Sequence, residues 1–186
     1  PDEIWVFDNY ALNIANMEFK NIPIKLHKNY YLENQVNIIK NKNNLHKLEK
    51  KKVLYVLEPI RKKWLPNETQ SGEFQALNFF MNNLAILNIT LDTELILRLH
   101  PSEKKEKYVE WLNSTKFESK RIEGADVPIP NHMSEANLVL GCDSFMLVLA
   151  SLAGKKVVST LPPWAPLSSL PHSEITHLRN QSGIFI

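Results

Sequence analysis

The pattern of apolar and polar positions divides the chain from residue 52 onward into short continuous runs and longer periodic stripes. A short aliphatic or β-branched run bounded by proline, glycine or polar residues is typical of a strand buried in a parallel sheet. The runs that fit this description cover residues 52–58, 94–99, 137–141 and 156–160, with a weaker one at 117–122.

Helical spacing occupies two of the intervals between these runs. Apolar side chains recur every three or four positions from Phe74 to Leu87, which predicts an amphipathic helix lying on a sheet. A second helix is expected to begin at Pro101, with Ser102 as its N-cap and Glu103 in its first turn.

A third helix is expected from Phe145 to the glycine stop at Gly154, with Asp143 or Ser144 as its N-cap. Strands that alternate with helices of this length indicate right-handed βαβ units and a parallel sheet covered by helices on both faces. The sequence therefore predicts a Rossmann-like α/β domain over residues 52–186.

The first 51 residues have a different pattern. Residues 1–35 predict a strand, a short helix and a second extended piece, and we interpret them as the tail of a preceding α/β domain. Residues 36–51 are interpreted as a linker, because Lys40–Lys52 holds six lysines and no aromatic residue that could stack on a nucleic-acid base. Since the chain starts at Pro1 without a methionine, we expect it to be a piece of a longer protein.

Composition narrows the class of protein. The 186 residues carry a net charge of only +2 and are 44% hydrophobic, which suits one domain with its own core. The single cysteine, Cys142, excludes a disulfide framework, and no Cys/His cluster has the spacing of a metal site. The longest apolar run, about six residues, is far below the ~20 that span a bilayer, so the cytoplasm is the expected compartment. Heavy use of Asn, Ile and Lys suggests an AT-rich bacterial genome.

Candidate binding residues follow the predicted strands, because ligands of open parallel sheets bind at the carboxyl ends of the strands. His100, Pro101 and Ser102 follow the second run, where a histidine and the free amides of a new helix could bind a phosphate. The alternative is a histidine that bonds to neighbouring backbone while Pro101 only starts the helix.

Asp143 and Ser144 follow the third buried run, and Arg61 follows the first. Ser144 and nearby amides could contact a phosphate or ribose while Asp143 orients the loop, and Arg61 could neutralise a diphosphate. The alternatives are a plain helix cap and a solvated surface charge. Secondary candidates at the rim of the site are Arg98, Glu103, Glu135, His172 and Ser173, the last two opening a helix after a proline-rich loop.

Three well-known nucleotide-binding and hydrolase motifs are absent from the sequence. It has no G-x-G-x-x-G fingerprint, no G-x-x-x-x-G-K-[ST] loop and no G-x-S-x-G elbow. His132, His172 and His177 lie in loops without ligand spacing and are expected to be surface histidines. Cys142 is expected to be an inert core residue rather than a nucleophile.

The order of these pieces resembles a known family. Arg98-Leu-His-Pro-Ser-Glu103, then Asn137-Leu-Val-Leu-Gly-Cys-Asp-Ser144 and Leu152-Ala-Gly-Lys-Lys-Val-Val-Ser159, is similar to the C-terminal, donor-nucleotide half of GT-B glycosyltransferases. The similarity is greatest to bacterial sialyltransferase-like and capsule- or teichoic-acid-polymerase-like members. It covers about residues 52–186, and by it residues 1–35 end the acceptor-side domain.

The resemblance implies transfer of a sugar from a CMP- or UDP-linked donor to a cell-surface glycan or related acceptor. His100 and the amides around Ser102 would contact the donor phosphate, and Ser144 and Asp143 the phosphate at the opposite strand end. In inverting members the general base belongs to the N-terminal domain, so this fragment alone would bind nucleotide without transferring sugar. The resemblance implies no metal, no cofactor and no nucleic acid, because the nucleotide-sugar is a co-substrate. It also implies peripheral association at the inner face of the cytoplasmic membrane.

At two places the sequence differs from the motifs of these enzyme families, and two alternative functions are kept. Leu149 stands where many retaining members carry the glutamate that binds the donor ribose, which leaves ribose recognition unassigned. UDP-N-acetylglucosamine 2-epimerases also have a His-Pro strand end, but here Asp143-Ser144 continues as Phe145-Met146 without their glycines. The alternatives are an epimerase-like enzyme and a non-catalytic Rossmann-like binding module.

Overall fold

The computed structural model describes residues 1–43, 50–65, 67–170 and 174–184, and the chain divides into two compact units. The first unit is residues 1–35 and the second is residues 36–186. Residues 44–49, which belong to the expected linker, lie outside the described residues.

The first unit is a strand–helix–strand motif with two parallel strands, as its pattern predicts. Asp8 caps the helix by accepting a hydrogen bond from the Ala11 amide at 2.6 Å. Trp5 stacks on His27 with ring centroids 4.1 Å apart. The elements are β1 (Ile4–Val6), α1 (Asn9–Glu18) and β2 (Ile24–Leu26).

Helix α2 (Tyr30–Asn43) begins in the first unit and ends in the second. Residues 36–43, expected within the linker, are therefore helical, and Val36 and Ile39 are buried. Lys42 donates to the side chain of Asn131 at 2.5 Å, which ties the end of α2 to helix α5 (Ile129–Glu135).

The second unit contains a six-stranded sheet in which all neighbouring strands are parallel. The order is β5-β4-β3-β6-β7-β8, so the first strand lies at the centre and the chain builds outward on both sides. This confirms the predicted Rossmann-like α/β fold. The strands are β3 (Lys52–Val56), β4 (Glu94–Arg98), β5 (Ser119–Glu123), β6 (Leu138–Gly141), β7 (Lys156–Ser159) and β8 (Thr176–His177).

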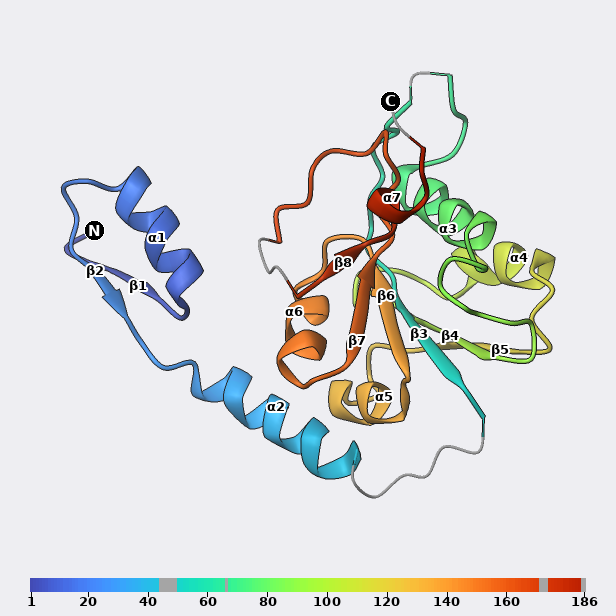
Figure 1. Ribbon diagram of the computed structural model, residues 1–186, viewed down its shortest axis with the longest axis horizontal. Coiled ribbons are helices and arrows are strands. Elements are labelled where there is room, and N and C mark those ends of the chain that lie inside the picture. The colour runs from blue at the N-terminus through green and yellow to red at the C-terminus, as the bar shows by residue number, and fades with distance from the viewer. Residues whose placement is uncertain (44–49, 66, 171–173, 185–186) are drawn as a thin grey trace. The chain divides into compact units, whose positions relative to one another are not determined.

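Helices cover both faces of this sheet (Figure 1). Helices α3 and α4 lie on one face, and α5 and α6 lie on the other (Figure 1). This division follows from the strand order, because right-handed crossovers built in opposite directions from a central strand place their helices on opposite faces. The remaining helices are α3 (Gly72–Asn82), α4 (Glu106–Ser114), α6 (Phe145–Leu152) and α7 (Leu178–Gln181).

The core explains why the strand runs are continuously apolar. Successive side chains of a strand point to opposite faces, and here both faces are buried. Tyr55 and Leu97 pack with Phe80 of α3 and Tyr108 of α4, while the neighbouring Leu54 is equally buried on the other face.

The start of the helix after β4 differs from the prediction. Helix α4 begins at Glu106, not at Pro101, and the expected cap by Ser102 is wrong. The Ser102 hydroxyl bonds to Nδ1 of His100 at 2.8 Å, and the Glu103 amide closes a turn onto the His100 carbonyl at 3.0 Å. These local bonds hold the backbone in a turn and delay the helix.

The C-terminal region also differs. A short strand, β8, stands at Thr176–His177, after the point where a helix was expected to open. His172 and Ser173, named as rim candidates, lie outside the described residues. Across the described ranges, every helix is too short or too polar to cross a bilayer.

Candidate functional site

The strand order reverses between β3 and β6, and a cavity lies at the carboxyl ends of these two strands. Its volume is about 380 Å³. This is where an open α/β sheet of this topology binds its ligand. The lining residues are Glu58, Pro59, Ile60, Trp64, Asp143, Leu161, Pro166 and Leu167.

Glu58 follows β3 and faces the loop after β6. Its Oε2 accepts a hydrogen bond from the backbone amide of Asp143 at 2.7 Å. In the described part of the chain, Oε1 has no hydrogen-bond partner. Burial raises the pKa of Glu58, the Asp143 amide opposes this shift, and the Asp143 charge adds to it. A carboxylate with one free oxygen therefore faces the cavity.

Asp143 has a different environment, because its carboxylate is held by the loop that forms the cavity wall. It accepts hydrogen bonds from the Ser168 hydroxyl, from the amide and hydroxyl of Ser169 at 2.9 and 2.5 Å, and from the Leu170 amide at 3.4 Å. Burial raises the pKa of Asp143, but the bonds from Ser168 and Ser169 outweigh it and leave the pKa below its ordinary value. Asp143 thus fixes the 168–170 loop through its hydrogen bonds.

Ser144 is the N-cap of α6, and its hydroxyl accepts from the Met146 amide at 3.3 Å. The cap interpretation is confirmed. Since α6 follows β6 directly, its first turn stands at the same edge of the sheet as the cavity.

His100 follows β4, the neighbour of β3, so it stands at the same edge about 10 Å, or two strand spacings, from the end of β6. The Ser102 amide donates to His100 Nδ1 at 3.2 Å. Because Nδ1 is an acceptor, the ring proton of the neutral imidazole is on Nε2, which is then a hydrogen-bond donor. Pro101 and Ser102 are exposed, and with α4 starting later there is no helix N-terminus at Ser102 to bind a phosphate.

Arg61 and Glu103 are brought together by the loops after β3 and β4. Arg61 Nη2 lies 3.3 Å from Glu103 Oε1, and the Arg61 side chain is 77% exposed. Lys107 joins Glu103 to the buried Glu73 at 2.7 and 2.5 Å, and the Tyr108 hydroxyl donates to Glu73 at 2.9 Å. Hydrogen bonding to Lys107 lowers the pKa of Glu103. An exposed guanidinium is thus held by a largely buried network.

Two secondary candidates lie away from the cavity. Arg98 is buried and donates to the carbonyls of Ala125 and Val127 at 3.2 and 2.7 Å, which holds the loop after β5. Glu135 pairs at 2.9 Å with Lys52, the first residue of β3, and so belongs to the opposite edge of the sheet.

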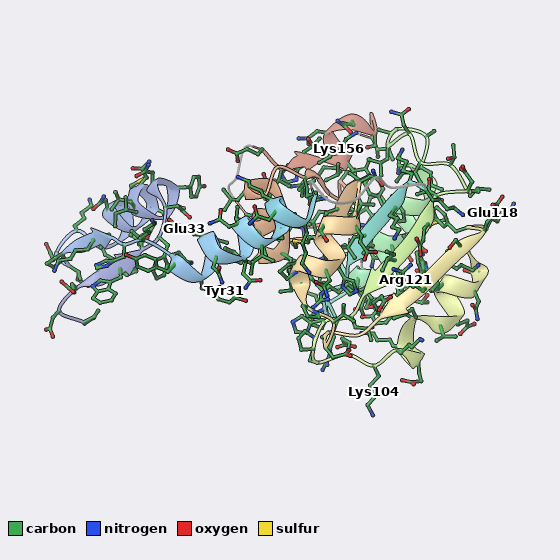
Figure 2. The ribbon with its side chains drawn as sticks, turned by 90° about the horizontal axis from the view of Figure 1, so that it is seen from below. Tyr31, Glu33, Lys104, Glu118, Arg121 and Lys156 are labelled. Atoms are coloured by element: carbon green, nitrogen blue, oxygen red, sulfur yellow. The ribbon has the colours of Figure 1, made fainter. Side chains whose placement is uncertain are left out.

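Two edges of the sheet can be followed in the side-chain view. Lys104, in the loop after β4, lies on the opposite side of this unit from Glu118 and Lys156, which stand at the beginning of β5 and β7 (Figure 2). Glu118 and Lys156 therefore provide charged positions away from the candidate site.

The expectation that His132 is a surface histidine is wrong, whereas His177 is partly exposed in β8. His132 is 5% exposed and its Nδ1 lies 2.5 Å from an Arg98 nitrogen. His177 pairs with Ser159 in the sheet, and its Nδ1 is buried without a hydrogen-bond partner among the described residues. Burial lowers the pKa of both histidines. Cys142 is buried and burial raises its pKa, which confirms it as an inert core residue.

Glu58 follows the first predicted strand as a polar group, but its sequence context predicted no role for it, and Trp64 was not predicted as part of the site. The signal for Glu58 was its place after a buried strand and before Pro59, the same signal that selected His100. Nothing in the sequence indicated that the 166–170 loop returns to this edge. Within the described ranges, no group of three or more His, Cys, Asp or Glu residues could hold a metal ion.

Comparison with known proteins adds no family to this geometry. No protein-family model matches the chain, and no curated protein matches it. What the chain is shown to contain is a Rossmann-like α/β domain with a six-stranded parallel sheet.

Proposed function

We propose that this chain is mainly the donor-binding half of a GT-B glycosyltransferase, which transfers a sugar from a CMP- or UDP-linked donor to a glycan. The observation that carries the proposal is the cavity at the switch point between β3 and β6, with His100 and Arg61 following the adjacent strands. The sequence resemblance supplies the reaction class. The strand order supports the proposal, because many open α/β sheets with this order bind nucleotides at the carboxyl ends of their strands.

The chemistry of the edge supports a nucleotide ligand. Nε2–H of His100 and the guanidinium of Arg61 are donors suited to phosphate oxygens. In glycosyl transfer such groups would stabilise the negative charge that develops on the departing nucleotide phosphate. The general base is not assigned to any residue of this chain, so the chain by itself is proposed to bind the donor without transferring sugar.

A non-catalytic binding module is the second candidate, and one observation favours it. Three of the candidate polar groups already have structural partners: Ser144 caps α6, Asp143 holds the 168–170 loop and His100 Nδ1 is bonded to Ser102. If these hydrogen bonds are the only function of the three side chains, they do not indicate a nucleotide site.

Calorimetric titration with CMP and UDP separates the two candidates. The transferase proposal predicts saturable binding that His100→Ala and Arg61→Ala each weaken by about tenfold or more, the cost of a lost charge-assisted hydrogen bond. Lys156→Ala, at the opposite edge, is the matched control and should bind as the parent chain does (Figure 2). If neither nucleotide binds the parent chain, the donor-binding proposal is wrong and the module interpretation stands.

A further inference from the structure

The charges around the candidate site are divided between two places. Among the described residues, the cavity lining consists of two carboxylates, Glu58 and Asp143, and otherwise of apolar side chains and prolines, with no cation. The cationic and donating groups, Arg61 and His100, follow β3 and β4 outside the lining. A phosphate in the cavity would meet like charge, whereas a neutral group with hydroxyl donors would not.

The size and walls of the cavity suit a nucleoside. About 380 Å³ lies within the range of small-molecule sites and is far more than one phosphate needs. Trp64, Ile60 and Leu161 give an apolar wall against which a planar base or a ribose face can pack.

Within the part of the chain that the structure describes, one of the two carboxylates has an oxygen left for a ligand. Both oxygens of Asp143 accept bonds from the 168–170 loop. Glu58 uses Oε2 for the Asp143 amide and has Oε1 without a partner in the described part of the chain. The amide therefore fixes the direction in which the free oxygen is presented.

We propose that Glu58 is the residue that recognises the nucleoside, with Oε1 accepting hydrogen bonds from the ribose hydroxyls while the phosphates lie toward His100 and Arg61. This inference rests on the proposed function, since it assumes that a nucleotide binds at this edge. It also assigns ribose recognition, which the sequence left unassigned because Leu149 stands where many retaining members carry a glutamate. In this structure Leu149 is a buried side chain of α6.

The test compares CMP and UDP with their 2′-deoxy and 3′-deoxy forms by calorimetry on the whole chain. In the parent chain, loss of the contacted hydroxyl should weaken binding about tenfold, as expected for a hydrogen bond to a charged group. In Glu58→Gln the side-chain oxygen stays with the Asp143 amide, so an NH₂ group replaces the free acceptor. The ratio between ribonucleotide and deoxynucleotide affinity should then fall toward one, and Glu58→Ala should give the same result.

The control is Glu118→Gln, which removes a carboxylate at the opposite edge and should leave the ratio unchanged (Figure 2). Each outcome decides a different claim. Nucleotide binding with a ribose preference that Glu58→Gln leaves intact, or with no ribose preference at all, overturns the role of Glu58 alone. Absence of binding by any of these nucleotides overturns the proposed function and the inference with it.

Discussion

At the residue scale, the candidate site contains two carboxylates, at neighbouring strand ends, whose pKa values are shifted in opposite directions. Burial raises the pKa of Glu58, whereas serine hydroxyls and amides leave the pKa of Asp143 lowered despite its burial. Pairs of acidic groups whose environments separate their pKa values are common where a protein binds or reacts. Burial is the largest cause for both groups. The directions differ because the hydrogen bonds to Asp143 outweigh burial, whereas the one bond described for the Glu58 side chain does not.

Glu58→Gln should raise the free energy of unfolding at neutral pH. A carboxyl whose folded-state pKa is raised contributes stability below its unfolded pKa, and that contribution is lost as the pH rises through the folded-state pKa. The gain from Glu58→Gln should therefore be present at pH 7.5, about three units above the ordinary glutamate pKa, and shrink toward pH 4. Urea denaturation of both chains at the two pH values measures it; a gain that is larger at pH 4 would contradict this account of Glu58.

Asp143→Asn should have the opposite effect. Asparagine can accept at one oxygen only and carries no charge, so at least one bond to the 168–170 loop is lost. We expect a loss of about 2 kcal/mol near neutral pH, in the range for hydrogen bonds to charged groups. Because the pKa of Asp143 is lowered in the folded state, its stabilising effect is complete above the unfolded-state pKa and is lost as the pH falls through the folded-state pKa. The difference in unfolding free energy between Asp143→Asn and the parent chain should therefore shrink in acid. An unchanged denaturation midpoint at pH 7.5 would show that the loop is held by other contacts.

At the scale of elements, the sequence predicted the strands of the sheet well and the loops at its carboxyl edge poorly. The runs at 52–58, 94–99 and 137–141 are continuous because both faces of the sheet are buried, and such runs can be recognised locally. The delayed start of α4 could not be recognised this way. It depends on the Ser102 hydroxyl, which forms a hydrogen bond with His100 and not with the amides of a first helical turn. Helix propensity does not predict which of these two bonds forms.

The candidate site was also predicted in part: the residues at strand ends were found, and those on distant loops were not. Strand-end position selected His100 and Asp143, and both stand at the carboxyl edge. Trp64 and the 166–170 loop reach the cavity through packing between segments distant in the sequence, which no local pattern encodes. Arg98 was named as a polar group at the end of a strand, but its guanidinium is buried and contacts His132 and the carbonyls after β5.

Gly72, the first residue of α3, supports the loop that carries the cavity wall. A Cβ at this position would lie 2.7 Å from Ile60 Cγ2, 2.8 Å from Trp64 Cε2 and 2.9 Å from the Lys62 carbonyl oxygen. Gly72→Ala should therefore destabilise the chain by about 1–3 kcal/mol, the usual cost of overpacking, despite alanine's better helix propensity. Thermal denaturation gives the stability. A Gly72→Ala chain as stable as the parent would contradict the close packing of this loop.

At the scale of the whole molecule, the two units have different means of stabilisation. The second unit buries a six-stranded sheet between helices, whereas the first has two short strands and one helix. Two strands rarely form an independently stable sheet. Several large apolar side chains of the first unit are also exposed, including Trp5 at 56% and Met17 at 73%.

Hydrogen exchange should reflect this difference. Amides of β1 and β2 should exchange through low-energy local opening, and those of β3 and β6 only through unfolding of the sheet. We expect the protection of the central strands to exceed that of β1 and β2 by at least about a hundredfold at neutral pH. Equal protection in the two units would mean that they unfold together.

The central claim is that the carboxyl edge of the six-stranded sheet, at its switch point, binds a nucleotide. Its most direct test is amide chemical-shift mapping during titration with CMP and with UDP. The account predicts that shifts gather in the segments 58–61, 100–103 and 143–146, and that Glu118, Glu135 and Lys156 at the other edge do not move. No saturable shift with either nucleotide, or shifts gathered at the opposite edge, would contradict it.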